Sequence, residues 1–595
     1  MIIVGLLVPV LIYLAVMKTM GWQVSTLDAS GALSYAAPTR ENVTLYASSN
    51  TEAYFKRIGG NYETLLVPWR GYFTTRKQGF KEIRTAEELS KQKAGVMILP
   101  SALSLSTEER AEILAYRAKG GSILSTWATG TRNGKGEWEG WQLLDSMGVK
   151  MLGEMPITDE ARNLTLAGES PLSHTLPAGK RIWMDKTSEP LLRVKGEFIA
   201  ARFMDFARIT DEARRNEGAV VYSEAAGGLN RVAYFAFAES AWESHPLAAY
   251  DLIEDTLRWL RREPALVRAS WPDGKSAAQI IEMDTEEGFP NALPFAEMMQ
   301  SLDYRATFYV LTSVGKLFPD ILTKLARDFE VGYHADVHNS FKGQPASIQE
   351  QRIQNMKAEM ASVVTDISRM TGFRAPTEGY DDTTEVLLQK AGIRHHAADP
   401  ARTEGRLPIF VKQDGVAIED ALIVLPRTQR DDINLTRQNL SVEQTRTELI
   451  EDFDLVLETG ALGLLSVHSQ NFGSDSTLAK AMPGFLEHLK ERRAKVWLAS
   501  AGRVADWWRE RDRFKLSYGN SGRRVEFNIT ITGKTPLSGA TVIAMLPQKG
   551  ILPEVESLKI GMPKPVVSRI DDFRASVVFP PLPPGNYAYQ MTFIR

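Results

Sequence analysis

Two histidines four residues apart, His334 and His338, are the most suggestive pair of side chains in the sequence; they lie in the segment EVGYHADVH. Both imidazoles can reach one metal ion if this segment forms a helical turn. Five of the eight histidines gather between residues 334 and 468: His334, His338, His395, His396 and His468. Because the chain has no cysteine, any metal ion must be held by His, Asp or Glu.

Carboxylates follow an apolar run upstream of these histidines. The segment IIEMDTE, residues 280–286, reads as a buried strand that ends in Asp284 and Glu286. Ligands and catalytic groups gather at the ends of parallel strands, where the loops converge. Taken alone, the segment also fits a solvated acidic turn. Further downstream come the sequence GFRAP with Arg374 and an apolar strand, residues 464–467, that ends in His468.

The elements that must position these residues form an α/β pattern from about 275 to 512. It includes a strand at ATFYV, residues 306–310, and a helix from about 318 to 329. An earlier α/β pattern covers residues 40–262, with apolar strands that predict a parallel, doubly wound sheet. Its clearest helix begins at Ser106, with Glu109 completing a capping box, and ends at Gly120.

Residues 262–274 are rich in Pro, Gly and charge and predict a hinge between the two α/β regions. From 515 to 595, short alternating segments broken by Gly and Pro predict a small β-sandwich, which we expect to be immunoglobulin-like. That region fits a passive spacer as well as a carbohydrate-binding module.

The order of the motifs resembles the NodB-homology polysaccharide deacetylases, carbohydrate esterase family 4. The motifs are the acidic strand end, ATFYV, E-V-G-x-H-x-x-x-H, F-R-x-P and the apolar strand with its terminal histidine, over about residues 278–500. The resemblance implies a distorted (β/α) barrel for residues 275–512 and the removal of acetyl groups from N-acetylated sugars. It also implies a divalent cation, Zn²⁺ first, with Co²⁺, Ni²⁺ or Mn²⁺ as alternatives.

Carried over by position, the resemblance makes Asp284 the catalytic base and His334 and His338 metal ligands. The family usually places an Asp directly after the base, whereas this chain has Thr285. Some relatives use a carboxylate two residues after the base, so we expect Glu286 to be the third ligand, with Glu287 as a substitute.

Arg374 matches the arginine that orients the base, and His468 matches the general acid. Asp399 is expected either to tune His468 or to form a turn before Pro400. His395 and His396 receive no role beyond lining the cleft. Two other segments, residues 425–427 and 431–432, fit either a sugar subsite or a solvated loop.

Residues 40–262 resemble the class I glutamine amidotransferase-like superfamily, on the stretch GVMILPSALSLSTEERAEILAYRAKGGSILST. Amidotransferases of that group need a cysteine nucleophile, and this chain has none. A scaffold or a glycan-binding module is therefore expected here, not a second active site.

The composition and the first residues indicate which partners and which location to expect. The net charge of −3 gives no indication of a nucleic-acid partner. Met1 to Met17 are almost wholly apolar, which favours a signal anchor within residues 1–22, with a cleaved signal peptide or a buried helix as alternatives. We therefore expect a membrane-tethered, extracytoplasmic deacetylase acting on a polysaccharide. The alternatives are a decayed glycan-binding or assembly protein and an amidohydrolase of small C–N compounds.

Overall fold

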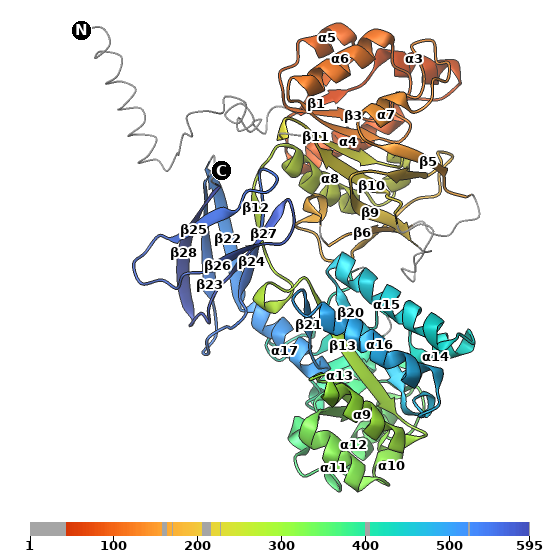
Figure 1. The fold of residues 1–595 in the computed structure, drawn as a ribbon, viewed down its shortest axis with the longest axis vertical. Coiled ribbons are helices and arrows are strands. Elements are labelled where there is room, and N and C mark those ends of the chain that lie inside the picture. The colour runs from red at the N-terminus through yellow and green to blue at the C-terminus, as the bar shows by residue number, and fades with distance from the viewer. Residues whose placement is uncertain are drawn as a thin grey trace.

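The computed structural model describes residues 43–156, 163–168, 170–204, 216–225, 228–398, 405–521 and 524–593. Three parts are visible in Figure 1: an N-terminal α/β part, a middle part around strand β13, and a C-terminal part made of strands. The apolar segment expected to be an anchor, residues 1–22, lies outside the described residues. Among the residues described, no helix is both long and apolar enough to cross a membrane.

The N-terminal part is built on a nine-stranded mixed sheet in the order β2-β1-β3-β4-β11-β10-β9-β6-β7. The first five run parallel: β2 (Lys81–Ile83), β1 (Val43–Tyr46), β3 (Val96–Leu99), β4 (Ser122–Thr126) and β11 (Arg231–Phe235). The other four are antiparallel: β10 (Val220–Glu224), β9 (Phe198–Met204), β6 (Asn163–Leu166) and β7 (Arg181–Trp183). The prediction of a wholly parallel sheet is therefore wrong for its second half. No α-helix of the described residues separates these later strands, and parallel pairing needs such crossovers.

Helices accompany the parallel half of this sheet: α3 (Ser49–Arg57), α4 (Glu63–Arg76), α5 (Ala86–Ser90), α6 (Thr107–Ala118), α7 (Gln142–Ser146) and α8 (Pro246–Leu260). A separate ribbon pairs β5 (Lys150–Glu154) with β8 (Leu192–Lys195). The predicted capping box at α6 is confirmed: the Glu109 backbone N–H donates to Ser106 Oγ at 3.2 Å, and Glu109 Oε2 accepts from the Ser106 N–H at 2.6 Å.

The middle part is a curled sheet that forms a parallel half-barrel, in the order β18-β19-β17-β16-β15-β14-β13-β20. Its strands are β13 (Ala277–Thr285), β14 (Thr307–Val310), β15 (Glu330–Tyr333), β16 (Gly372–Arg374), β17 (His395–Ala398), β18 (Ile409–Phe410), β19 (Ile423–Pro426), β20 (Leu462–His468) and β21 (Val496–Leu498). Only β18 pairs antiparallel. Strand β13 is buried along its whole length, with β14 and β21 on one edge and β20 on the other.

Helices follow these strands: α9 (Ala292–Ser301), α10 (Thr312–Gly315), α11 (Pro319–Asp328), α12 (Ala346–Ala361), α13 (Asp382–Lys390), α14 (Asp432–Arg437), α15 (Val442–Thr459), α16 (Thr477–Glu491) and α17 (Ala501–Asp512). The strand predicted at residues 306–310 and the helix predicted at 318–329 are both confirmed. This alternation brings the carboxyl ends of the parallel strands to one edge, where the sequence has its titratable residues.

The C-terminal part consists of two four-stranded antiparallel sheets, β12-β24-β27-β26 and β22-β23-β28-β25. Seven strands come from the end of the chain: β22 (Phe514–Ser521), β23 (Arg524–Ile531), β24 (Thr541–Met545), β25 (Pro553–Ser557), β26 (Val566–Arg569), β27 (Arg574–Val578) and β28 (Gly585–Phe593). The eighth, β12 (Ala265–Arg268), comes from the segment expected to be a hinge and pairs with β24. Apolar side chains of both sheets, such as Leu266 and Phe527, share one core with side chains of the half-barrel, such as Ile280.

Candidate active site and metal centre

The candidate site lies at the carboxyl ends of the parallel strands of the half-barrel. Asp284 is near the end of β13, Arg374 ends β16 and His468 ends β20, while His334 directly follows β15. Asp284 and His468 are direct neighbours in the register of β13 and β20. Parallel pairing alone therefore brings together side chains that are far apart in sequence.

Glu286, His334 and His338 converge on one point. Their ligand atoms all lie within 4.8 Å of one another. Glu286 Oε1 is 2.8 Å from His334 Nε2 and 2.8 Å from His338 Nε2. Glu286 and His334 are buried, whereas the His338 side chain is 43% exposed, so solvent reaches the group from one side.

The donor set fits a divalent transition metal. His334 Nδ1 is 2.9 Å from the carbonyl oxygen of Arg374, which can only accept, so Nδ1 carries a proton and Nε2 is the nitrogen that faces Glu286. A cation between these groups would satisfy the imidazoles and the carboxylate together. Two imidazoles and one carboxylate form a set that zinc and its neighbours bind readily, whereas Mg²⁺ and Ca²⁺ prefer oxygen ligands.

Strand alternation explains why Glu286 joins the group and Thr285 does not. Residues two apart on an extended chain point to the same side, so Glu286 follows Asp284. The Thr285 hydroxyl is buried and donates to the Tyr309 carbonyl of β14 at 3.0 Å. Glu287, the substitute ligand considered above, is exposed and is not among the grouped ligands. Gln470 donates to Glu286 Oε2 at 2.7 Å and so orients the carboxylate.

The histidine pair lies on an irregular loop and not on a helical turn, the arrangement considered from its spacing. Ala335 has a φ of 77°, an unfavourable value for a residue with a side chain. Arg352 of α12 holds the loop, because its Nε donates to Asp336 Oδ1 at 2.9 Å and its Nη2 to the Val337 carbonyl at 2.8 Å. This clamp supplies the order that a helix would otherwise give the two imidazoles.

Asp284 is held by Arg374. Arg374 Nε donates to Asp284 Oδ2 at 2.8 Å, and Nη1 donates to Glu282 Oε1 at 2.7 Å. Asp284 Oδ1 is buried and has no hydrogen-bond partner within the described part of the chain, so it can accept a proton. Burial raises the pKa of Glu282, against the lowering effect of Arg374 and with a contribution from Asp284. This buried position thus favours the neutral form of Glu282 more than water does.

Glu378 is a third carboxylate on the same guanidinium, at 3.1 Å from Arg374 Nη2. It also accepts from Arg427 Nε at 2.6 Å. Arg427, considered above for a sugar subsite, therefore lies in the ion-pair network behind the base. Because Arg427 also binds Glu378, this carboxylate does not depend on Arg374 alone. Arg374 can therefore keep its hydrogen bond to Asp284.

His468 has a buried carboxylate partner that the sequence did not single out. Asp432 Oδ1 accepts from His468 Nδ1 at 2.6 Å, and Asp432 Oδ2 accepts from the His468 backbone N–H at 2.7 Å. Burial lowers the pKa of His468, but Asp432 and Asp284 outweigh it and raise that pKa to about 9. His468 is therefore a cation at neutral pH, and its Nε2 lies 3.6 Å from Asp284 Oδ2.

Asp399, the expected partner of His468, lies outside the described residues. From the sequence alone, Asp432 had no role beyond that of one residue in an Asp-Asp pair that fits a loop. Its position could have indicated a role, because it begins α14 a few residues after the end of β19, where active-site groups of such sheets gather.

His395 and His396 do not lie at the strand ends where the site is built. They begin β17, at the opposite end of the sheet, and both are buried. His395 Nε2 lies 3.1 Å from Glu330 Oε1, and His396 Nε2 lies 3.0 Å from Glu385 Oε1. They serve as buried ion-pair or hydrogen-bond partners, and the idea that they line the cleft is wrong.

Residues 274–396 match the family model described as polysaccharide deacetylase. No curated protein matches the chain.

Several solved structures are similar to it at low identity. A probable polysaccharide deacetylase from Pseudomonas aeruginosa PAO1 is 16% identical over 41% of this chain and 94% of that one, with a TM-score of 0.36. The allantoinase PuuE is 15% identical over 41% and 93%, also with a TM-score of 0.36. A pseudoenzyme of carbohydrate esterase family 4 from Bacillus anthracis is 14% identical over 40% and 68%, with a TM-score of 0.29. The family-model match alone assigns residues 274–396 of this chain to a polysaccharide deacetylase domain.

Proposed function

We propose that this protein is a metal-dependent hydrolase that removes acetyl groups from N-acetylated sugars of a polysaccharide. One observation carries the proposal: the three metal-ligand candidates Glu286, His334 and His338 lie beside a base and an acid, Asp284 and His468. Glu286, His334 and His338 would hold a divalent ion, and when bound it would supply Lewis-acid chemistry for an acetyl carbonyl and for water.

The side chains around the trio have complementary proton-transfer roles. Asp284 Oδ1 accepts the proton of the attacking water, while Arg374 holds Oδ2 and keeps the carboxylate oriented. His468, protonated at neutral pH, donates a proton from Nε2 to the departing amine. Asp432 accepts the Nδ1 proton and so orients the ring for that transfer. The products are acetate and a sugar that carries a free amine.

The decisive assay measures acetate and new amines released by the metal-loaded full chain from chitin-like, peptidoglycan and biofilm polymers. We expect both products in equal amounts from at least one N-acetylated polymer, and neither from Asp284→Asn. Acetate without new amines would identify an O-acetyl esterase. Cleavage of small cyclic amides alone would favour an amidohydrolase. Metal binding without turnover of any substrate would favour a decayed, glycan-binding protein.

We also propose that the protein works outside the cytoplasm, tethered by its N-terminal segment. The polymer class of substrate and the apolar run Met1 to Met17 support this proposal. The location is the periplasm or the cell surface, and protease treatment of spheroplasts tests it: digestion is expected, and full protection would contradict an outside location.

A further inference from the structure

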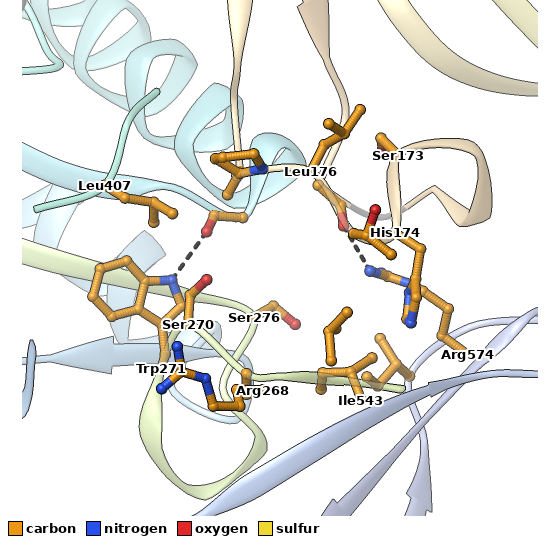
Figure 2. Close-up of a pocket in the computed structure, with 18 of the residues that line it drawn as sticks. Ser173, His174, Leu176, Arg268, Ser270, Trp271, Ser276, Leu407, Ile543 and Arg574 are labelled. Carbon is orange, nitrogen blue, oxygen red and sulfur yellow. Dashed lines mark hydrogen bonds between the residues drawn. The ribbon is translucent and has the colours of Figure 1, made fainter. Parts of the chain in front are cut away.

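A cavity of about 500 Å³ lies where the three parts of the molecule meet. The N-terminal part contributes His174. Strand β12 and the residues after it contribute Arg268 and Trp271. Helix α17 of the middle part contributes Arg511, and β27 of the C-terminal part contributes Arg574. Figure 2 shows Arg268 and Trp271 at one end of the cavity and His174 and Arg574 at the other. Its volume is within the range of small-molecule sites.

This cavity is remote from the candidate active site. Its walls include Ser276 and Gly460, just before the strands β13 and β20 begin, whereas Asp284 and His468 lie where those strands end. A ligand in the cavity would therefore not touch the catalytic residues.

The lining is rich in positive charge. It contains four basic side chains and no Asp or Glu: Arg268, Lys275, Arg511 and Arg574. Among the residues that the structure describes, a carboxylate pairs with one of the four, Arg574, whose Nε lies 2.7 Å from Asp571 Oδ2. Lys275 Nζ donates to two backbone carbonyls, of Arg493 at 2.7 Å and Ala494 at 3.2 Å.

Arg268 and Arg511 form a like-charged pair tied together through backbone oxygens. Arg268 Nη1 donates to the Arg511 carbonyl at 3.1 Å, and Arg511 Nη2 donates to the Arg268 carbonyl at 3.3 Å. Burial, together with the charge of Arg268, lowers the pKa of Arg511 to about 9. Within the residues that the structure describes, neither guanidinium has an ion pair.

Arg268 and Arg511 are both half-buried, and a partly desolvated cation normally has an anionic partner, because desolvation of an unpaired charge is costly. Here two guanidinium groups lie together without one, and each retains N–H groups that make no hydrogen bond within the described chain. Guanidinium groups are well suited to bind oxyanions, with two parallel hydrogen bonds to carboxylate, sulfate or phosphate. Apolar lining residues such as Leu407 and Ile543 provide room for an uncharged body attached to the anion.

We propose that this three-part cavity is a binding site for an oxyanion, held by Arg268 and Arg511, either as a free inorganic ion or as the acidic group of a sugar. Because the site needs residues from separate parts of the chain, it exists only in the folded protein. Bound ligand therefore stabilises the assembled molecule. This inference stands apart from the proposed deacetylase activity.

The experiment is calorimetric titration of the full chain with sodium sulfate, sodium phosphate and sodium glucuronate. Sodium chloride at matched ionic strength and uncharged glucose are the ligand controls. We expect saturable binding of at least one oxyanion and a matching rise in melting temperature. Preference for sulfate or phosphate would support a free ion, and preference for glucuronate would support an acidic sugar.

Variants separate a site from general charge attraction. Arg268→Gln and Arg511→Gln should each weaken binding by about tenfold or more, since each removes a charged donor. Arg513→Gln is the matched control: Arg513 also donates to backbone oxygen, from Nε to the Thr532 carbonyl at 2.8 Å, but does not line the cavity. Its affinity should remain unchanged.

If Arg511→Gln does not fold, the loss of oxyanion affinity is measured with Arg268→Gln and Lys275→Gln, which change two other residues of the cavity lining. The proposal is overturned if no oxyanion binds saturably, or if Arg268→Gln binds as tightly as the Arg513→Gln control.

Discussion

Asp284 and His468 occupy the same register position on the neighbouring parallel strands β13 and β20, and Asp284 Oδ2 lies 3.6 Å from His468 Nε2. Each also has its own buried partner, Arg374 for the carboxylate and Asp432 for the imidazole. An anion and a cation are thus held face to face by two adjacent strands. Such an arrangement suits a reaction in which one group accepts a proton and the other donates one.

Removing either group should abolish most of the activity. We expect Asp284→Asn and His468→Ala to lower kcat/KM for acetate release roughly 100- to 10,000-fold, the usual contribution of a positioned acid or base. His488→Ala is the matched control, because His488 also pairs with an Asp, Asp454 at 2.8 Å, but on helices α16 and α15. An unchanged kcat/KM in a folded Asp284 or His468 variant would remove that residue from its role.

The partner Asp432 should set the alkaline limit of activity. As pH rises through the pKa of His468, about 9, the ring loses the proton it must donate, and activity falls. In Asp432→Asn the carboxylate that raises this pKa is gone, so the fall should begin at lower pH. The full kcat/KM profile from pH 6 to 10 measures the shift. A profile that superimposes on that of the unaltered protein would argue against the pairing.

Metal content should depend on the convergent trio. His334→Ala removes one of two imidazoles from the group, so we expect metal occupancy after purification to fall well below one ion per chain. Elemental analysis measures this directly, again beside His488→Ala. Full occupancy in His334→Ala would refute the assignment of that ligand.

Glu282 should be replaceable by a neutral hydrogen-bond acceptor. Burial raises its pKa, and Glu282→Gln keeps an acceptor for Arg374 Nη1. We expect kcat/KM of Glu282→Gln to be nearest to normal at low pH, where the carboxyl is protonated, and the ratio of variant to unaltered activity to change as pH rises, because only the carboxyl ionises. Glu282→Ala should instead lower stability by about 1–3 kcal/mol, because a buried donor loses its partner. Equal pH profiles would contradict this reading.

His174 should make stability sensitive to acid. Burial and the nearby Arg574 lower its pKa to about 3, whereas an unfolded histidine titrates near 6.5. The unfolded chain therefore binds a proton first, so the free energy of unfolding should fall as pH drops from 6.5 towards 3. The loss amounts to about 2 kcal/mol by pH 5. Urea unfolding at pH 7 and pH 5 should show less acid sensitivity in His174→Gln than in His245→Gln, an exposed control.

The residues at strand ends could be located from the sequence because parallel strands collect them at one edge. Asp284, Glu286, Arg374 and His468 each follow or end an apolar run, and the structure brings them together. Asp432 could not be located in this way, because it lies 36 residues from His468 and begins a helix. An Asp pair at a helix start resembles an ordinary N-terminal cap in sequence. The loop that carries His334 and His338 was also unpredictable, since its shape depends on Arg352, which lies in the following helix.

The predictions of the hinge and of a wholly parallel N-terminal sheet were incomplete or wrong because they concern strand pairing. Strand pairing over long sequence distances leaves little local signal. Residues 265–268 have the Pro and charge of a linker at their flanks, yet they pair with residues 542–545. In the antiparallel half of the N-terminal sheet the apolar runs do not reveal strand direction, even where the paired strands β10 and β11 are neighbours in sequence, whereas the capping box of α6 is local and was predicted correctly.

The pairing of β12 with β24 has a consequence for how the chain is made. During synthesis, β12 emerges from the ribosome well over two hundred residues before its partner, so the half-barrel is complete while that edge still lacks its neighbour. Unpaired edges recruit other chains. Premature termination after residue 512 should therefore produce an aggregating product, not a smaller soluble protein.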